Sequence, residues 1–178
     1  MGVDPSKGKQ DRTGDYSAII MLGIDRDLCL WVNADLDNGR PVEPLASDLG
    51  QRSIVGDCLK NFKEFKPATV LWETNAFQSM AADAMLRYAT ARGVQMPITT
   101  VSHHIPKIQR IRGLAPFLAQ KRLRIKDTPG GRLLVTQLME FPVGDHDDGP
   151  DGLVTAIEAG NYIMYGEDTS ANVVVLRG

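Results

Sequence analysis

The chain has 178 residues, of which 43% are hydrophobic and 24% are charged, and its formal net charge is −2 at pH 7. These values are typical of one globular domain with a real core. No apolar run approaches the roughly 18–20 residues that a membrane span needs, so we expect a soluble protein without a membrane partner. Cys29 and Cys58 form no CxxC motif and cannot hold zinc by themselves, which favours a reducing cytoplasm.

The first half of the chain predicts strands followed by a helix. Three strands are expected at residues 1–5, 15–24 and 28–34, and together they would form an antiparallel meander. A helix of about eighteen residues should follow, from a cap at Ser47 to Phe65 or Lys66, because its apolar positions have helical spacing.

The rest of the chain alternates between strand and helix patterns. The predicted elements are a strand at 68–72, a helix at 77–92, a strand at 97–101, a helix at 107–118, an edge strand at 120–125, a turn at 128–131, helices at 132–141 and 150–165, and a β-type tail at 171–176 that we cannot place. Three antiparallel strands followed by helix-crossover strands predict an α/β fold, with helices flanking a mixed sheet of about five strands or more.

Acidic residues mark the candidate site. The run His146-Asp147-Asp148-Gly149-Pro150-Asp151 opens the last helix, Asp4 ends the first strand, and Glu73 ends the strand at 68–72. Clustered carboxylates repel one another unless a cation lies among them. We therefore expect Asp4, Glu73 and Asp148 to meet around divalent metal ions. Asp151 lies on the same helix face as Asp148, three residues further on.

Each acid also has an ordinary interpretation. Asp4 could be a turn residue before Pro5, Glu73 could pair with an arginine, and Asp148 could cap the helix. Asp15 and His146 are candidates for a supporting role, Asp15 behind the ligands and His146 in orienting water or moving protons.

A basic segment, from His103 to Lys126, lies between the predicted strand at 97–101 and the acidic run. It contains no Asp or Glu and holds seven basic residues: Lys107, Arg110, Arg112, Lys121, Arg122, Arg124 and Lys126. Such a segment in an otherwise acidic chain favours a polyanion partner, although a solvated helix face is an equal alternative. Lys107, Arg110 and Arg112 are the best candidates for DNA phosphate contacts, with Lys7 and Lys9 in the first loop. Arg110 could instead pair with a structural acid.

Five short motifs occur in a fixed order along the chain. They are Gly2-Val3-Asp4-Pro5-Ser6, Asp15-Tyr16-Ser17, Trp72-Glu73-Thr74-Asn75, Lys107-Ile108-Gln109-Arg110-Ile111 and His146-Asp147-Asp148-Gly149-Pro150-Asp151-Gly152-Leu153. Together they resemble the nuclease domain of the large terminase subunit of tailed bacteriophages, over residues 1 to about 165. The element order is that of the ribonuclease H-like fold.

The resemblance implies an endonuclease that cuts concatemeric viral DNA during genome packaging in the host cytoplasm. It implies two Mg2+ or Mn2+ ions held by Asp4, Glu73 and Asp148, with Asp147 and Asp151 as further ligands, Asp151 because related resolvases use a D-x-x-D pair. Asp4 would bridge the two ions. Double-stranded DNA, an ATPase domain, the portal and the small terminase subunit are the implied partners.

The chain also departs from a complete terminase subunit. No G-x-x-x-x-G-K-[ST] phosphate-binding loop occurs, so we expect residues 1–178 to be one nuclease domain from a longer chain, without its ATPase motor. A Holliday-junction resolvase and a catalytically silent DNA-binding module of the same fold are alternatives. An actin-like ATPase is a third, but Pro5-Ser6 does not match its phosphate-binding Gly-Thr.

Overall fold

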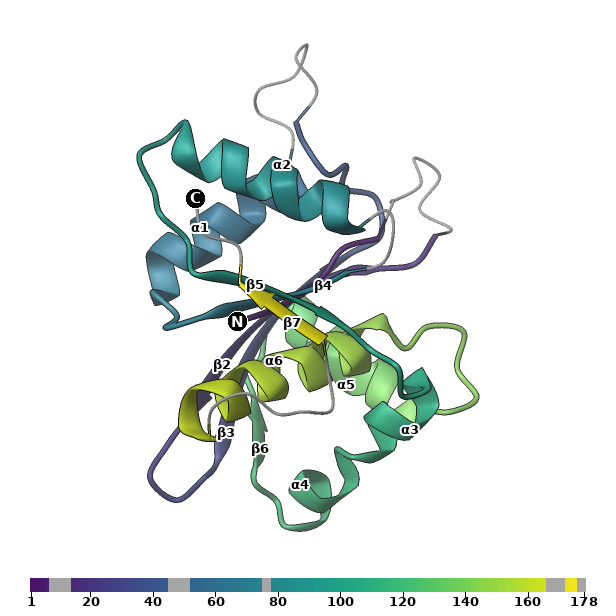
Figure 1. The fold of residues 1–178 in the computed structure, drawn as a ribbon. Helices are drawn as coiled ribbons and strands as arrows, with labels where there is room; N and C mark the ends of the chain where they lie inside the picture. The colour runs from purple at the N-terminus through teal and green to yellow at the C-terminus, as the bar shows by residue number, and fades with distance from the viewer. Residues whose placement is uncertain (7–13, 45–51, 75–77, 166–171, 176–178) are drawn as a thin grey trace.

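The computed structural model describes residues 1–6, 14–44, 52–74, 78–165 and 172–175. Seven strands form one sheet in the order β6-β3-β2-β1-β4-β5-β7 (Figure 1). The strands are β1 (Gly2–Asp4), β2 (Ser17–Ile24), β3 (Leu30–Asp37), β4 (Val70–Glu73), β5 (Ile98–Ser102), β6 (Leu123–Ile125) and β7 (Asn172–Val175). The prediction of a mixed sheet with at least five strands is confirmed.

The sheet joins an antiparallel half to a parallel half at β1. On one side, β1 pairs with β2 and β2 with β3, both antiparallel, as the meander prediction required. On the other side, β1, β4 and β5 are parallel. The strands at the two sheet edges are β6, which is parallel to β3, and β7, which is antiparallel to β5. The β-type tail, for which the sequence predicted no position, thus forms β7 beside β5.

Helices cover both faces of the sheet. On one face, α1 (Ile54–Phe65) and α2 (Gln78–Thr90) pack on a core that includes Val3, Ile19 and Trp72. On the other lie α3 (Lys107–Arg112), α4 (Ala115–Ala119), α5 (Pro129–Glu140) and α6 (Asp148–Tyr165) (Figure 1). None of the helices in the described residues has the length and apolar character that crossing a membrane requires.

Two helix starts differ from prediction. The first long helix has twelve residues and begins at Ile54, where the Ser53 hydroxyl accepts a hydrogen bond from Gly56 N at 3.1 Å. The expected cap, Ser47, lies outside the described residues. The predicted turn at 128–131 is wrong, because Thr128 caps α5 and Pro129 begins it. Proline is well suited to a first helical turn, where its missing N–H costs no hydrogen bond.

The predicted helix at 107–118 is broken. It ends at Arg112, and a second short helix begins at Ala115. Pro116 lies in the first turn of this second helix, where it fits, whereas in the middle of a continuous helix it would remove a backbone hydrogen bond and clash with the preceding turn.

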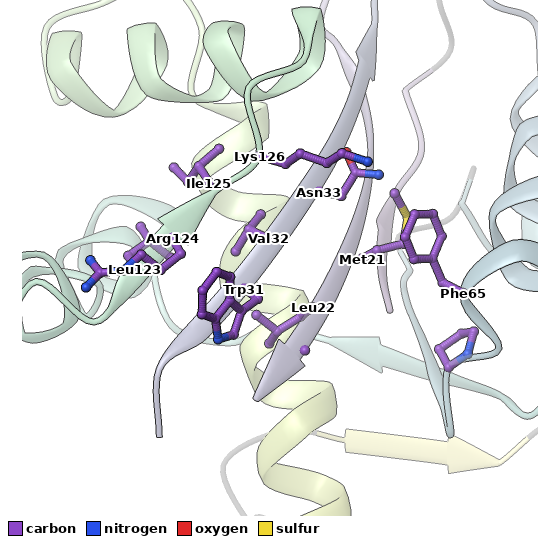
Figure 2. Close-up of a pocket in the computed structure, with 12 residues that line it drawn as sticks. Met21, Leu22, Trp31, Val32, Asn33, Phe65, Leu123, Arg124, Ile125 and Lys126 are labelled. Carbon is purple, nitrogen blue, oxygen red and sulfur yellow. The ribbon is translucent and has the colours of Figure 1, made fainter. Parts of the chain in front are cut away.

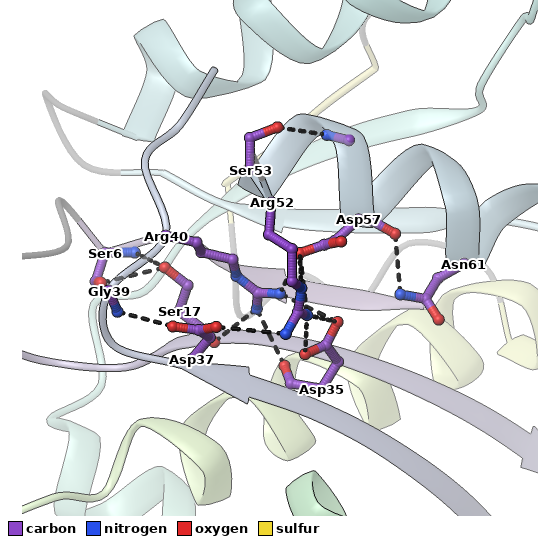
Figure 3. Close-up of polar contacts among 11 residues, drawn as sticks. Ser6, Ser17, Asp35, Asp37, Gly39, Arg40, Arg52, Ser53, Asp57 and Asn61 are labelled. Carbon is purple, nitrogen blue, oxygen red and sulfur yellow. Dashed lines mark hydrogen bonds and ion pairs between the residues drawn. The ribbon is translucent and has the colours of Figure 1, made fainter. Parts of the chain in front are cut away.

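A buried arginine ties α1 to the antiparallel half of the sheet. Arg40 is 2% exposed, and its guanidinium pairs with Asp35 and with Asp57 of α1, each at 3.1 Å (Figure 3). It also donates to the carbonyl of Ser17 at 2.9 Å. Arg52, which is far more exposed, pairs with the same two acids. Ion pairs through Arg40 therefore join α1 to β3.

Candidate metal centre

The ends of two neighbouring strands bring the first two acids together. Because β1 and β4 are paired and parallel, their carboxyl ends lie at the same edge of the sheet, and these ends are Asp4 and Glu73. The start of α6 lies across the same edge. A Cβ at Gly2 would be only 2.4 Å from the backbone nitrogen of Ala156, so glycine allows α6 to lie directly on β1.

The carboxylates form two groups at this edge. Asp4, Glu73 and Asp151 each offer an oxygen, and these oxygens lie within 4.8 Å of one another. Asp15, His146 and Asp148 form a second group by the same criterion. The expected set combined Asp4 and Glu73 with Asp148 and included Asp151 as a further ligand. The structure groups Asp4 and Glu73 with Asp151 and places Asp148 in the second group.

Backbone contacts explain why Asp148 belongs to the second group. Its Oδ2 accepts a hydrogen bond from the backbone N–H of Tyr16 at 2.9 Å, which turns the carboxylate toward the beginning of β2. The Tyr16 ring meets the His146 ring edge-on, with centroids 5.0 Å apart. Asp15 and His146, expected to support the site, thus lie beside Asp148. Nothing in the sequence pattern pointed to the Tyr16 N–H.

Burial and crowding favour the protonated form of the first group. Burial, followed by the neighbouring charges of Glu73 and Asp151, raises the pKa of Asp4 well above its ordinary value. Burial raises the pKa of Glu73, and burial together with the Glu73 charge raises the pKa of Asp151 to about 7. A bound cation would reverse these shifts, because it stabilises the carboxylates in their charged form.

Two oxygens of this group are available for a ligand. Glu73 Oε2 and Asp151 Oδ1 are buried and have no hydrogen-bond partner among the described residues. A buried carboxylate oxygen without a partner costs free energy. A group of three carboxylates, two of which carry such an oxygen, fits a hard divalent cation such as Mg2+ or Mn2+, which prefers oxygen ligands.

Two cations from α3 reach into the acids. Arg110 places Nη2 2.7 Å from Asp151 Oδ2 and Nη1 3.3 Å from Glu73 Oε1. Lys107 Nζ lies 2.7 Å from Asp147 Oδ1 and 3.2 Å from Asp148 Oδ1. Asp147 therefore contacts Lys107 at the edge of the site, and Lys107 links it to Asp148.

The expected DNA contacts are accordingly divided. Lys107 and Arg110 lie in the acidic centre, which is the set of Asp4, Glu73, Asp147, Asp148 and Asp151. Arg110 pairs there with Glu73 and Asp151, as the alternative interpretation of this arginine predicted. Arg112 is exposed on the same helix. Lys7 and Lys9 lie outside the described residues.

Comparison with known proteins identifies the fold. No protein-family model and no curated protein sequence matches the chain. Among solved structures, it is similar to the yeast mitochondrial Holliday junction resolvase Ydc2, with a TM-score of 0.52 and 12% sequence identity, over 93% of this chain and 80% of the resolvase chain. The fold is ribonuclease H-like. In this ribonuclease H-like fold, the acidic centre lies where the meander meets the parallel strands. At 12% identity, the likeness concerns the fold alone.

Proposed function

We propose that this chain is a metal-dependent endonuclease that cuts double-stranded DNA by hydrolysing phosphodiester bonds. The observation that carries the proposal is the group of Asp4, Glu73 and Asp151, with two buried carboxylate oxygens that lack a partner among the described residues. Divalent ions bound there would activate a water molecule and stabilise charge on the phosphate and on the leaving oxygen.

The two acidic groups divide the ligand roles. We assign Asp4, Glu73 and Asp151 to one ion, and Asp148 to a second ion together with Asp15 and His146. As the resemblance to the terminase nuclease domain implies, we propose Asp4 as the ligand shared by both ions. Asp147 would act through Lys107, which it contacts at 2.7 Å.

The basic residues of α3 would meet the DNA backbone. Lys107 and Arg110 border the carboxylates, so a phosphate that approaches the ions would also come within reach of both cations. Exposed Arg112 would contact a phosphate further along the strand, as would Lys7 and Lys9. This contact is independent of base sequence and weakens with salt.

The more specific proposal is the nuclease domain of a phage large terminase subunit, with Mg2+ or Mn2+ as cofactor. Its support is the order of the five motifs, three of which supply Asp4, Glu73 and Asp151 to one group. In this proposal, the domain acts in the host cytoplasm on concatemeric viral DNA, beside an ATPase domain, the portal and the small subunit.

The second candidate is a resolvase-like endonuclease, and the similarity to Ydc2 favours it. The two candidates differ in substrate. A resolvase-like enzyme should cut a synthetic four-way junction in preference to a linear duplex of the same sequence arms. A terminase-like nuclease should cut both without that preference.

Nicking of supercoiled plasmid in the presence of Mn2+ tests the shared part of the proposal. We expect Asp4→Asn and Asp151→Asn each to reduce nicking by at least about 100-fold, more than most outer-shell changes around a metal cost. Asp83→Asn, an exposed acid on α2, is the matched control and should keep full activity. Nicking that survives both site changes, or that proceeds in EDTA, would exclude this mechanism.

A further inference from the structure

A groove opens on a part of the sheet that the helices leave uncovered. Its volume is about 680 Å3. It is lined by residues of β2, β3 and β6, by Lys126 directly after β6, and by Phe65 and Pro67 at and just beyond the end of α1 (Figure 2). Trp31 and Phe65 lie on either side of it, and they are 53% and 40% exposed. This groove takes no part in the acidic centre.

Strand register places two rows of side chains across the groove. Gly23, Trp31 and Arg124 are direct cross-strand neighbours on β2, β3 and β6. The next row contains Asn33 and Lys126, since Lys126 N donates to the carbonyl of Val32 at 2.8 Å. Each row therefore ends in a basic residue, Arg124 on the edge strand β6 and Lys126 directly after it.

Trp31 is held in an open position. Its Nε1 donates to Asp25 Oδ2 at 2.8 Å, which fixes the edge of the indole ring. Opposite it, Gly23 has no side chain, and a Cβ built there would already lie 3.9 Å from the Cβ of Trp31. A flat ring could thus reach the indole on the side of Gly23, because no side chain at that position stands in its way.

Charge indicates what kind of partner fits the groove. Arg124 and Lys126 are the charged residues among the described ones that line the groove, and Asp25 lies at its edge, where it accepts the hydrogen bond from Trp31. Basic groups beside exposed aromatic faces are the two features by which proteins bind single strands of nucleic acid, since bases stack on the rings and phosphates pair with the cations. A duplex keeps its bases paired inside and offers none to Trp31.

We infer that this groove binds single-stranded nucleic acid, with a base stacked on Trp31 and the backbone phosphates on Arg124 and Lys126. The site is separate from the acidic centre. Ala18 pairs with Asp4, and Gly23 lies five residues further along β2, which is roughly 16 Å of extended chain. The inference therefore does not depend on the proposed nuclease activity.

Tryptophan fluorescence tests the inference directly, because the chain has two tryptophans and the other, Trp72, is fully buried. In EDTA, the oligonucleotide dT12 should quench the emission of the wild-type protein. In Trp31→Phe, the remaining Trp72 emission should not respond to dT12. Quenching that persists in this variant would place the oligonucleotide elsewhere and overturn the inference.

Anisotropy of fluorescein-labelled dT12 measures the contribution of each group. We expect Trp31→Ala to weaken binding on the order of ten-fold, as the loss of one stacked base does. Arg124→Ala/Lys126→Ala should weaken binding and flatten its salt dependence. The matched control, Arg87→Ala/Arg92→Ala, removes the same charge from exposed positions on or just after α2 and should bind normally.

Three results would contradict the inference. The first is an equal loss of dT12 affinity in the control variant. The second is binding of a dA12·dT12 duplex that is as tight as that of dT12 and also depends on Trp31. The third is quenching of the Trp31 emission by a Leu/Glu-rich peptide but not by dT12. The last would assign the groove to an acidic protein partner. Asp4→Asn should keep dT12 binding even where it loses plasmid nicking, so the two proposals can fail separately.

Discussion

Asp148 and Asp151 are three residues apart at the start of α6, yet they belong to different groups of acids. Asp151 lies with Asp4 and Glu73, whereas Asp148 accepts a backbone hydrogen bond from Tyr16. We compare the affinity of the tighter-binding Mn2+ ion in two variants. We expect Asp151→Asn to weaken it by at least about ten-fold more than Asp148→Asn does. Isothermal titration calorimetry measures both affinities. A larger loss in Asp148→Asn would contradict this grouping.

Arg40 has a different role from the cations around the acidic centre. It is almost fully buried and joins Asp35 of β3 to Asp57 of α1. We expect Arg40→Ala to lower the free energy of unfolding by about 3–5 kcal/mol, because removing one partner leaves buried charge behind. Arg52→Ala, at a side chain that is 56% exposed, should cost about 0–1 kcal/mol. Urea denaturation compares the two, and equal losses would contradict the prediction.

At the scale of the element, α3 is a short helix that supplies both cations of the acidic centre. Lys107 lies within 4.0 Å of Asp147, Asp148 and Asp151, at 2.7, 3.2 and 3.8 Å. Its charge opposes a metal ion at the same carboxylates. We therefore expect Lys107→Ala to tighten Mn2+ binding in the absence of DNA by about ten-fold.

The same helix provides a control for this prediction. Arg112→Ala removes one positive charge from an exposed position and should leave the Mn2+ affinity unchanged in the same calorimetric titration. Weaker Mn2+ binding in Lys107→Ala would mean that Lys107 orients the carboxylates for the ion instead of opposing it.

At the scale of the whole molecule, the acidic centre links stability to pH and metal. Without metal, the pKa of Asp151 is raised to about 7, whereas an unfolded chain releases this proton near pH 4. The protonated acid therefore favours the folded state fully below about pH 4, and this contribution is lost as the pH rises through 7.

Thermal unfolding measures this link. In EDTA, we expect the melting temperature to fall between pH 5 and pH 8, by on the order of 5 °C. Saturating Mn2+ should raise it more at pH 8 than at pH 5, because the ion binds the charged carboxylates. Asp151→Asn should reduce both effects. A melting temperature in EDTA that rises over this range would contradict the raised pKa.

Sequence patterns located most of the elements and marked Asp4, Glu73 and Asp151 among the candidate ligands. Asp4 and Glu73 each follow an apolar β-type run, and parallel strands bring their ends to one edge. The choice between Asp148 and Asp151 could not be made in this way, because it depends on the Tyr16 N–H, 132 residues distant in sequence from Asp148. The position of β7 likewise depends on its pairing with β5.

Local chemistry by itself determined the α/β class, the strand ends that carry the acids, and the basic segment before the last helix, since periodicity and residue type act over neighbouring positions. Only the tertiary structure decided that Lys107 and Arg110 meet those acids, that Asp151 joins Asp4 and Glu73, and that Trp31 stands open beside Arg124. These facts arise from contacts between distant segments, and such contacts depend on how the whole sheet and its helices pack.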